Sequence, residues 1–316
     1  MIPFMHFNFI SYCVNLYDIF LQTVRGDNMK KEISKHVLSL LLFGSNGIFA
    51  GMLDRSSYDI VFVRTLLGTF LLLTIFLCTK GKFQFFHHKR SFLYLMLSGL
   101  SMGLSWMFLY EAFQQIGVCI ATLGYYCGPM IVMLLSPFIF HEKLSRTKIG
   151  CFFLVLIGMF FLNAHAVTES HTGFGILCAI FSAIFYAIMV IFNKKSAKIT
   201  GIESTIFQLF FACIIVACVV FLKKGFALPI KANEILPMCI LGLSNTGFAC
   251  YLYFTSLSKI NVQTTAILGY LEPLSAIFFS VIFLNERLLP LQIVGAFFIL
   301  GGAFFSELRN SKKEKS

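Results

Sequence analysis

The sequence predicts an all-α integral membrane protein with ten transmembrane helices, arranged as two five-helix repeats of inverted topology. Three observations predict this fold: long apolar runs, basic residues gathered on one side of the membrane, and a similarity between the two halves of the chain. Of the 316 residues, 58% are hydrophobic and only 12% are charged. Such a composition is typical of membrane proteins that cross the bilayer several times.

Ten apolar runs are long enough to cross the membrane, because about 20 helical residues span roughly 30 Å of hydrocarbon. They lie near residues 33–53, 58–79, 92–114, 117–139, 147–165, 173–192, 203–222, 235–257, 262–284 and 288–306.

The basic residues lie mainly in alternate connections between these runs. If the chain starts inside, the inner segments hold eighteen Lys and Arg residues and the outer segments hold five. This bias predicts that both termini lie in the cytoplasm, with the protein in the cytoplasmic membrane. The net charge of +11 is thereby explained by topology, and it implies no nucleic-acid partner.

The two halves of the chain resemble each other at a shift of 144 residues, which aligns 116–144 with 260–288. Identical residues recur at the aligned positions, for example Tyr126 with Tyr270 and Pro129 with Pro273. Five helices in each half is an odd number, so the second half must enter the membrane in the opposite sense. We therefore divide the chain into an N-terminal tail (1–32), a first repeat (33–166), a second repeat (173–306) and a basic cytoplasmic tail (307–316).

The first 28 residues differ from the rest because polar side chains interrupt their apolar sequence. A spanning helix is not expected there, and the basic start of a cleaved signal is missing. We interpret Met29 as the natural start and the preceding residues as an upstream extension. An interfacial helix is the alternative.

The ninth run carries Glu272 and Pro273 at its centre. A carboxylate at this depth costs roughly 2.5 to 3.5 kcal/mol, and proline removes a backbone hydrogen bond that lipid cannot replace. Pro129 lies at the equivalent point of the fourth run, so we expect a helix break at both prolines. Paired broken helices are typical of a solute cavity at mid-membrane, although packing alone is the alternative.

The second half resembles the EamA-type half of the drug/metabolite transporter superfamily. The residues that carry the resemblance are 270–274 (YLEPL), 284–288 (LNERL), Gln292, Gly295 and Gly302. The first half repeats the pattern with Gly128 and Pro129, 141–144 (HEKL) and Gly158. The resemblance covers about 33–306 and implies ten helices, cytoplasmic termini and export of small metabolites or drugs by alternating access. It leaves the substrate open.

Two acidic positions and one basic position are candidates for function, and two further glutamates are expected to be structural. Glu272 could bind a substrate amine or carry a proton, and the alternative is that it donates a hydrogen bond to backbone at the kink. We expect Arg64 and Glu111 at similar depth, as a gating ion pair or as side chains that reach separately to the interface. Glu142 and the equivalent Glu286 match the family pattern, and we expect them to cap amides of the following helix.

A polar and aromatic set lies on the helices that the resemblance places around the cavity. Such side chains can stack on a solute, hold a cation or orient a polar group, although each one alone is more often a packing residue. The set is Asn46, Trp106, Tyr126, Tyr186, Asn245, Tyr251 and Tyr270, with Tyr110 beside it. Glycines at three- and four-residue spacing, such as Gly44, Gly47 and Gly51, predict close helix packing.

The sequence predicts no cofactor, no metal site and no catalytic centre. The ten cysteines are scattered, and the seven histidines are expected in tails, loops or helix ends. No motif pairs a nucleophile with a base, and no phosphate-binding loop is present.

The expected function is therefore a secondary transporter that exports a small amphipathic metabolite, with an amino acid as the leading substrate. Its partners are that solute and the lipid bilayer. Proton coupling and oligomeric state stay open, because Glu272 alone decides neither. A carrier for sugars, nucleotide sugars or cationic drugs is the alternative within transport. The first span has Ser45 and Asn46 but no acidic residue, which weakens the comparison with proton-coupled multidrug relatives.

Overall fold

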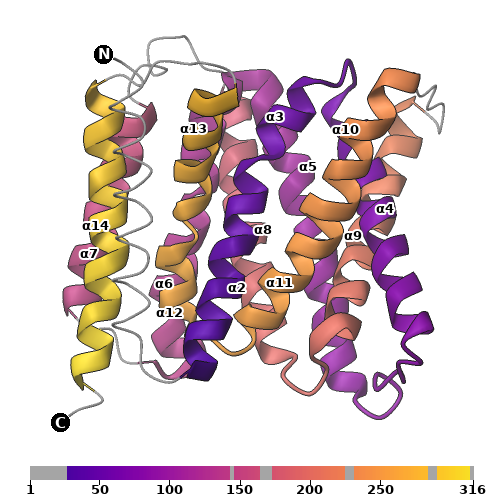
Figure 1. The fold of residues 1–316 in the computed structure, drawn as a ribbon, viewed down its shortest axis with the longest axis horizontal. Coiled ribbons are helices and arrows are strands. Elements are labelled where there is room, and N and C mark those ends of the chain that lie inside the picture. The colour runs from indigo at the N-terminus through magenta and orange to yellow at the C-terminus, as the bar shows by residue number, and fades with distance from the viewer. Residues whose placement is uncertain (1–26, 143–145, 164–172, 225–230, 284–289, 314–316) are drawn as a thin grey trace.

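A computed structural model of the protein describes residues 27–142, 146–163, 173–224, 231–283 and 290–313. Every regular element in these ranges is helical, and the helices stand side by side in one bundle (Figure 1). The predicted start at Met29 depends on a tail whose first 26 residues lie outside the described ranges, as does Glu286.

The first apolar run forms two helices with a break between them. They are α2 (Asp27–Gly44) and α3 (Asn46–Gly51), and Ser45 separates them. The Ser45 hydroxyl donates to the Leu42 carbonyl oxygen at 2.7 Å. A serine that bonds back to its own helix in this way commonly accompanies a bend.

The second run forms α4 (Ser57–Cys78). Its N-cap is Ser56, whose hydroxyl accepts from the Asp59 amide at 3.4 Å. This capping bond satisfies one of the amides that a helix start leaves without an intrahelical partner.

The third run and half of the fourth form one stretch of helical backbone, α5 (Lys89–Tyr125). Its contacts with α8 (Gly173–Lys195) show that the chain reverses direction inside this stretch. Ser98 and Ser105 donate to the carbonyl oxygens of Met189 and Ser182, which is an antiparallel order. By contrast, Gly124 near the end of α5 packs on Ala179, and Gly128 just beyond α5 packs on Ala183, which is a parallel order.

The remaining helices have the bounds that follow. They are α6 (Cys127–Phe140), α7 (Arg146–Asn163), α9 (Gly201–Lys224), α10 (Ile235–Cys239), α11 (Ala249–Leu257), α12 (Val262–Leu268), α13 (Leu271–Phe283) and α14 (Pro290–Lys313), with a 3₁₀ turn η2 (Ala232–Glu234) and a π-helical segment η3 (Ile240–Phe248).

Six helical stretches of the described chain are long and apolar enough to cross a membrane, when α2 with α3, and the segments from η2 to α11, each count as one stretch. They end at Gly51, Cys78, Ile116, Lys195, Lys223 and Leu257. The fourth and ninth predicted runs do not qualify as single helices because each is divided near its proline. Cys127–Phe140 and Ile293–Gly302 are shorter apolar segments.

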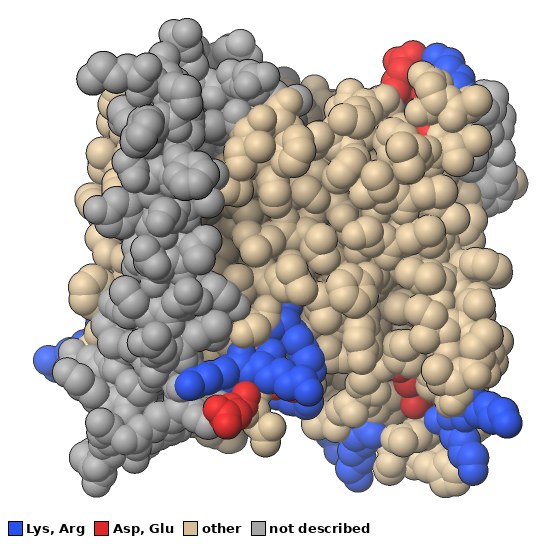
Figure 2. Space-filling model, viewed as in Figure 1, with Lys and Arg blue, Asp and Glu red and all other residues tan. Residues whose placement is uncertain are grey.

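The two ends of the bundle differ in charge. Most of the Lys and Arg side chains visible in Figure 2 lie along its lower edge, where α2 begins and α14 ends. On the opposite, upper edge, Arg55 binds Glu234 at 2.6 Å, and this carboxylate raises the pKa of Arg55 above its usual value. We call these sides the lower and upper edges below.

Glycines set the closest helix contacts. A Cβ on Gly99 would lie 2.6 Å from the Gln208 carbonyl oxygen, and one on Gly103 would lie 2.9 Å from that of Ala212. Gly44 is packed as tightly, whereas Gly47 and Gly51 face open space. In the first run, therefore, the predicted close packing is found at Gly44 but not at Gly47 or Gly51.

Candidate functional site

Two helix breaks meet in the middle of the bundle. One lies at Tyr126, between α5 and α6, and the other at Gly269 and Tyr270, between α12 and α13. Each lies about one turn before a proline, whose missing amide leaves a carbonyl without its helical partner. The Tyr270 hydroxyl donates to the Tyr126 carbonyl oxygen at 2.8 Å, so one break satisfies a polar group of the other.

Glu272 occupies the first turn of α13, directly after the second break. Its side chain is half-buried and accepts no hydrogen bond from the described residues. The alternative role expected for it, donation to backbone at the kink, is therefore absent in this part of the chain. Its carboxyl interacts electrostatically with Arg64, Tyr125 and Tyr186.

The backbone of Glu272 touches the first helix at Gly44. A Cβ on Gly44 would lie 2.9 Å from the Glu272 carbonyl oxygen and 1.9 Å from the Ser275 hydroxyl oxygen. Ser275 also donates to the Leu40 carbonyl oxygen at 3.3 Å. Only a glycine allows α2 and α13 to approach this closely, so Gly44 positions Glu272 beside the break at Ser45.

The π-helical segment η3 carries two polar residues toward the same region. Asn245 donates to the Ser45 hydroxyl at 2.7 Å. Thr246 donates to the Leu241 carbonyl oxygen at 2.7 Å and accepts from Arg64 Nε at 2.8 Å. The Arg64 guanidinium also lies over the Trp106 ring, 5.1 Å from its centroid.

The sequence itself contains a signal for this π-helix. Residues 99–101 (GLS) match 242–244 (GLS) at a shift of 143, whereas Gly103 matches Gly247 at 144. The eighth predicted run (235–257) therefore holds one residue more than the third (92–114) at the point where the π-helix forms. One extra residue fits a π-bulge, a feature often found at functional sites.

The expected ion pair between Arg64 and Glu111 is not made in this structure, although both residues are described. Glu111 binds Lys223 at 3.0 Å and accepts from the Tyr58 hydroxyl at the upper edge. Arg64 instead points inward to Thr246, since η3 offers it a hydroxyl acceptor and Trp106 an aromatic face. The direction of the Arg64 side chain did not follow from its depth, because depth does not fix which way a side chain points.

Five tyrosines gather around the breaks. The Tyr125 ring lies 5.3 Å from those of Tyr126 and Tyr186, and the Tyr126 ring lies 5.8 Å from that of Tyr270. The Tyr186 and Tyr253 hydroxyls are 3.1 Å apart. Tyr126 and Tyr270 are buried, so packing is their visible role. Tyr251 is partly buried against the hydrophobic cluster that contains Tyr253. Tyr125 and Tyr253 were not among the expected site residues.

Glu142 caps α12, and among the described residues it accepts no hydrogen bond from α7, the helix that follows it. Its carboxylate accepts from the amides of Val262 and Gln263 at 3.0 and 3.4 Å, which start α12. His141 adopts a left-handed conformation with φ of 56°, which ends α6 and turns the chain. Glu142 therefore joins the end of α6 to the start of α12, where the first amides have no partner inside their own helix.

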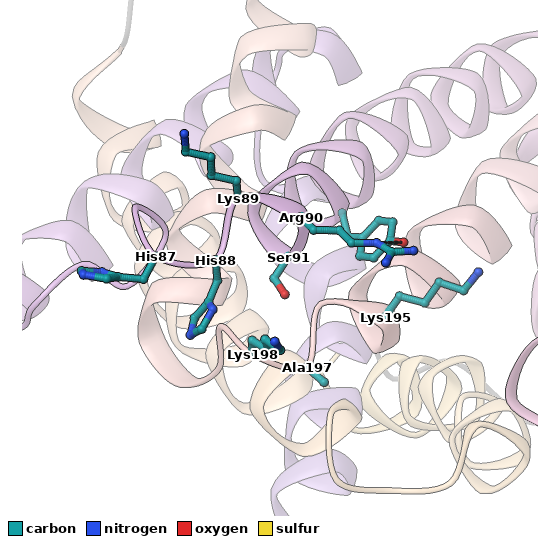
Figure 3. A pocket seen from close by; sticks show the side chains of 9 residues that line it. His87, His88, Lys89, Arg90, Ser91, Lys195, Ala197 and Lys198 are labelled. Carbon is teal, nitrogen blue, oxygen red and sulfur yellow. Dashed lines mark hydrogen bonds between the residues drawn. The ribbon is translucent and has the colours of Figure 1, made fainter.

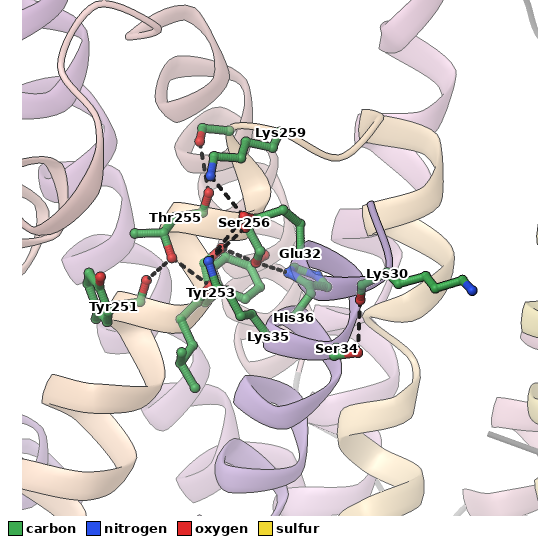
Figure 4. Close-up of polar contacts among 12 residues, drawn as sticks. Lys30, Glu32, Ser34, Lys35, His36, Tyr251, Tyr253, Thr255, Ser256 and Lys259 are labelled. Atoms are coloured by element: carbon green, nitrogen blue, oxygen red, sulfur yellow. Dashed lines mark hydrogen bonds and ion pairs between the residues drawn. The ribbon is translucent and has the colours of Figure 1, made fainter. Parts of the chain in front are cut away.

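His36 departs from the expectation that histidines lie in tails, loops or helix ends. It is fully buried between α2 and α11, where Nδ1 lies 2.9 Å from the Ser256 hydroxyl. Its ring stacks on Tyr253 at 4.8 Å (Figure 4). One turn closer to the lower edge, Glu32 binds Lys259 at 2.8 Å. These contacts join the start of α2 to the end of α11.

Two surface cavities lie away from these residues. One, of about 580 Å³, is lined by side chains that include Lys89, Arg90, Lys195 and Lys198 (Figure 3). The other, of about 500 Å³, lies between α7 and Phe305. Neither contains an expected site residue, and within the described chain no cluster of His, Cys, Asp or Glu has the geometry of a metal site.

Comparison with known proteins identifies the family. The model of the EamA-like transporter family matches residues 31–164 and again residues 173–308. The chain belongs to the EamA-like transporter family. It is accordingly a multi-pass membrane transporter and not an enzyme.

Two curated relatives cover most of the chain. An uncharacterized transporter, YxxF of Bacillus subtilis (strain 168), is 26% identical over 294 residues, which are 92% of this chain and 94% of the relative. The threonine/homoserine exporter RhtA of Escherichia coli (strain K12) is 25% identical over 258 residues, which are 80% and 82% of the two chains.

A solved crystal structure has a similar fold. It aligns with a TM-score of 0.75 and 16% sequence identity, covering 87% of this chain and 97% of that chain. At this identity the likeness concerns the fold alone.

Proposed function

We propose that this EamA-family transporter is a secondary exporter of a small amphipathic metabolite, with an amino acid as the leading substrate. The observation that carries the proposal is Glu272. It is a half-buried carboxyl without a hydrogen-bond partner in the described chain, next to a helix break at the centre of the bundle. An ionisable group at such a place in a membrane protein is a candidate solute or ion site.

The architecture that we propose has ten spans in two inverted repeats. In support, contacts recur at a shift of 144 residues with the two halves exchanged. A Cβ on Gly158 would lie 2.7 Å from the Gly295 carbonyl oxygen, and one on Gly302 would lie 2.8 Å from that of Cys151. The Tyr126–Tyr270 hydrogen bond joins equivalent residues, as expected at a two-fold axis between the halves.

In further support, two other contacts pair each broken span with the first helix of the opposite half. Gly128 packs on Ala183 of α8, and its counterpart Glu272 packs on Gly44 of α2. In such inverted repeats, one half rocks against the other around a site between them. We propose alternating access of this kind.

The proposed orientation has the lower edge and both termini in the cytoplasm, with the protein in the cell membrane. The basic residues of the lower edge favour this orientation because short cytoplasmic segments are enriched in Lys and Arg.

The relative that exports threonine and homoserine supports an amino acid as the solute, since it covers 80% of this chain. The aromatic and polar side chains around Glu272, among them Asn46, Trp106, Tyr186 and Asn245, suit an amphipathic molecule of that size.

The direct test is counterflow in proteoliposomes that contain the purified protein. A panel of labelled amino acids is added outside vesicles loaded with the unlabelled solute, with and without a pH gradient. Uptake above protein-free vesicles supports the proposal, and its dependence on the gradient reports proton coupling. Flux of a sugar, a nucleotide sugar or a cationic drug without flux of any amino acid would contradict it.

A further inference from the structure

Arg64 is a buried cation that packing does not explain. Only 6% of the residue is exposed. Its Nε donates to Thr246 at 2.8 Å, while its two Nη groups have no hydrogen-bond partner among the described residues. Arginine inside a membrane is retained where its planar fork has an anion to bind. A carboxylate is the natural match, since it can accept from both Nη groups at once.

A continuous set of contacts leads from Arg64 to Glu272. Arg64 binds Thr246, and the neighbouring Asn245 donates to Ser45 at 2.7 Å. Ser45 follows Gly44, whose packing partner is the Glu272 backbone. The two charges consequently belong to one region of the interior, where they interact electrostatically.

The two charged groups nevertheless do not bind each other. An ion pair requires nitrogen and oxygen within about 4 Å, and both residues are fully described without such a pair. Opposite charges that lie near each other in a low-dielectric interior would gain from direct contact. Because the described residues do not make this contact, each charge lacks an ionic partner that a solute could supply.

A third group is also without a partner. The Oδ1 atom of Asn46 is buried and accepts no hydrogen bond from the described residues. Asn46 starts α3, which contacts both η3 and α13. An acceptor here suits an ammonium group, because its three N–H donors point in different directions and one carboxylate does not reach all of them.

The two charges also break the similarity between the halves. At a shift of 144 residues, Arg64 corresponds to Gln208, and Glu272 corresponds to Gly128. Gln208 is engaged with Ser98 at 2.6 Å. The shared scaffold therefore requires neither charge, which separates both from the architecture that the halves have in common.

We propose that Arg64 and Glu272 form the two poles of a zwitterion site, in which Arg64 binds the solute carboxylate and Glu272, with Asn46, binds its ammonium group. This inference rests on the proposed transport of an amino acid and adds which residues select it. In an α-amino acid both charged groups are attached to one carbon, so a single molecule can bridge the two side chains. Trp106, against the guanidinium, fixes the direction of the arginine fork.

The site should therefore discriminate by charge at both ends of the solute. Removal of either solute charge leaves a buried protein charge unpaired, and a hydrogen bond between charged groups is worth roughly 10- to 100-fold in binding. The amide and the decarboxylated amine lack the anionic group, whereas an N-acetyl derivative lacks the cationic one.

The experiment measures binding by thermal shift of the purified protein, and competition in counterflow, with four probes. The probes are L-threonine, L-threonine amide, 1-amino-2-propanol and N-acetyl-L-threonine. Wild type is expected to prefer threonine over each of the other three by roughly 10- to 100-fold. Arg64→Gln introduces the residue type found at the equivalent position, Gln208. This variant should lose its preference for threonine over the amide and the amine. Glu272→Gln should lose its preference for threonine over the N-acetyl derivative.

Three controls separate recognition from folding. Arg64→Lys keeps the cation and should keep most of the preference over the amide. Arg90→Gln and Glu32→Gln change charges at the lower edge and should leave all ratios unchanged. Each variant is compared only after its melting temperature without solute and its monodispersity match those of wild type.

The outcomes distinguish this site from the proposed function. Equal binding of threonine and its amide by wild type overturns the zwitterion site, while flux of threonine would still support amino-acid transport. Loss of both preferences together in each variant also overturns it, because the poles would then not be separate. Failure of wild type to bind any amino acid overturns the site and the amino-acid assignment together.

Discussion

Gly44→Ala tests the close approach of α2 and α13 that positions Glu272. The new methyl group would lie 2.8 Å from the Ala276 amide nitrogen and 2.9 Å from the Glu272 carbonyl oxygen, besides its clash with Ser275. Backbone atoms cannot rotate away as a side chain can. The two helices must therefore separate, which weakens the Ser275–Leu40 hydrogen bond as well.

The magnitude follows from two opposing effects. Overpacking costs about 1 to 3 kcal/mol, and contact with backbone favours the upper half of that range. Alanine in place of glycine in a helix returns up to about 1 kcal/mol. We expect a net loss of about 1 to 2 kcal/mol in the free energy of unfolding.

Gly47→Ala is the matched control, because nothing lies within 4 Å of its added methyl group. It should be neutral or slightly stabilising. At roughly 2 to 4 °C per kcal/mol, the Gly44 variant should melt about 2 to 8 °C below the Gly47 variant in a thermal unfolding assay of the purified protein. Equal melting temperatures would refute the close contact and the placement of Glu272 that depends on it.

Three further predictions concern other contacts. Tyr270→Phe removes the hydrogen bond to the Tyr126 carbonyl and should cost about 1 kcal/mol by thermal unfolding, whereas Tyr94→Phe, whose hydroxyl bonds only to exposed Arg90, should cost far less; equal effects would contradict the bond between the breaks. Glu142→Gln removes a charged cap from α12 and should cost about 1 kcal/mol with a lower transport rate; a variant as stable and active as wild type would dismiss the cap. With the native cysteines replaced, Asp54→Cys in intact cells should react with a membrane-impermeant maleimide and Lys31→Cys should not; the reverse pattern would invert the proposed orientation.

Much of the fold could be predicted because its signals are local or repetitive. Apolar runs locate helices that must satisfy their own backbone groups in lipid. Pro129 and Pro273 located the two breaks to within about one turn, since proline removes a helical hydrogen bond and crowds the preceding turn. The match of two segments to one family model extends the same repetition over nearly the whole chain.

The direction in which side chains point was harder to predict. Arg64 and Glu111 were expected to meet because they share a depth, yet Arg64 turns to Thr246 and Glu111 to Lys223. Each choice depends on a hydroxyl or an amine from a helix distant in the sequence. Glu142 is a similar case, since capping was predicted correctly but the helix that it caps, α12, belongs to the other half.

Some site residues have no signal on their own. Tyr125, Tyr253 and His36 are ordinary in the sequence and gain their role from packing against partners across the bundle. Thr246 is different, because the extra residue of the π-helix is visible as a change of shift between the halves. A comparison of the repeats residue by residue would have found it.

Counterflow of labelled L-threonine into proteoliposomes, with wild type and Glu272→Gln side by side, asks whether Glu272 binds the solute. We expect uptake by wild type well above protein-free vesicles, and a loss of roughly tenfold or more in the variant at equal protein content. Unchanged kinetics in the variant would show that Glu272 serves the helix break and not the solute.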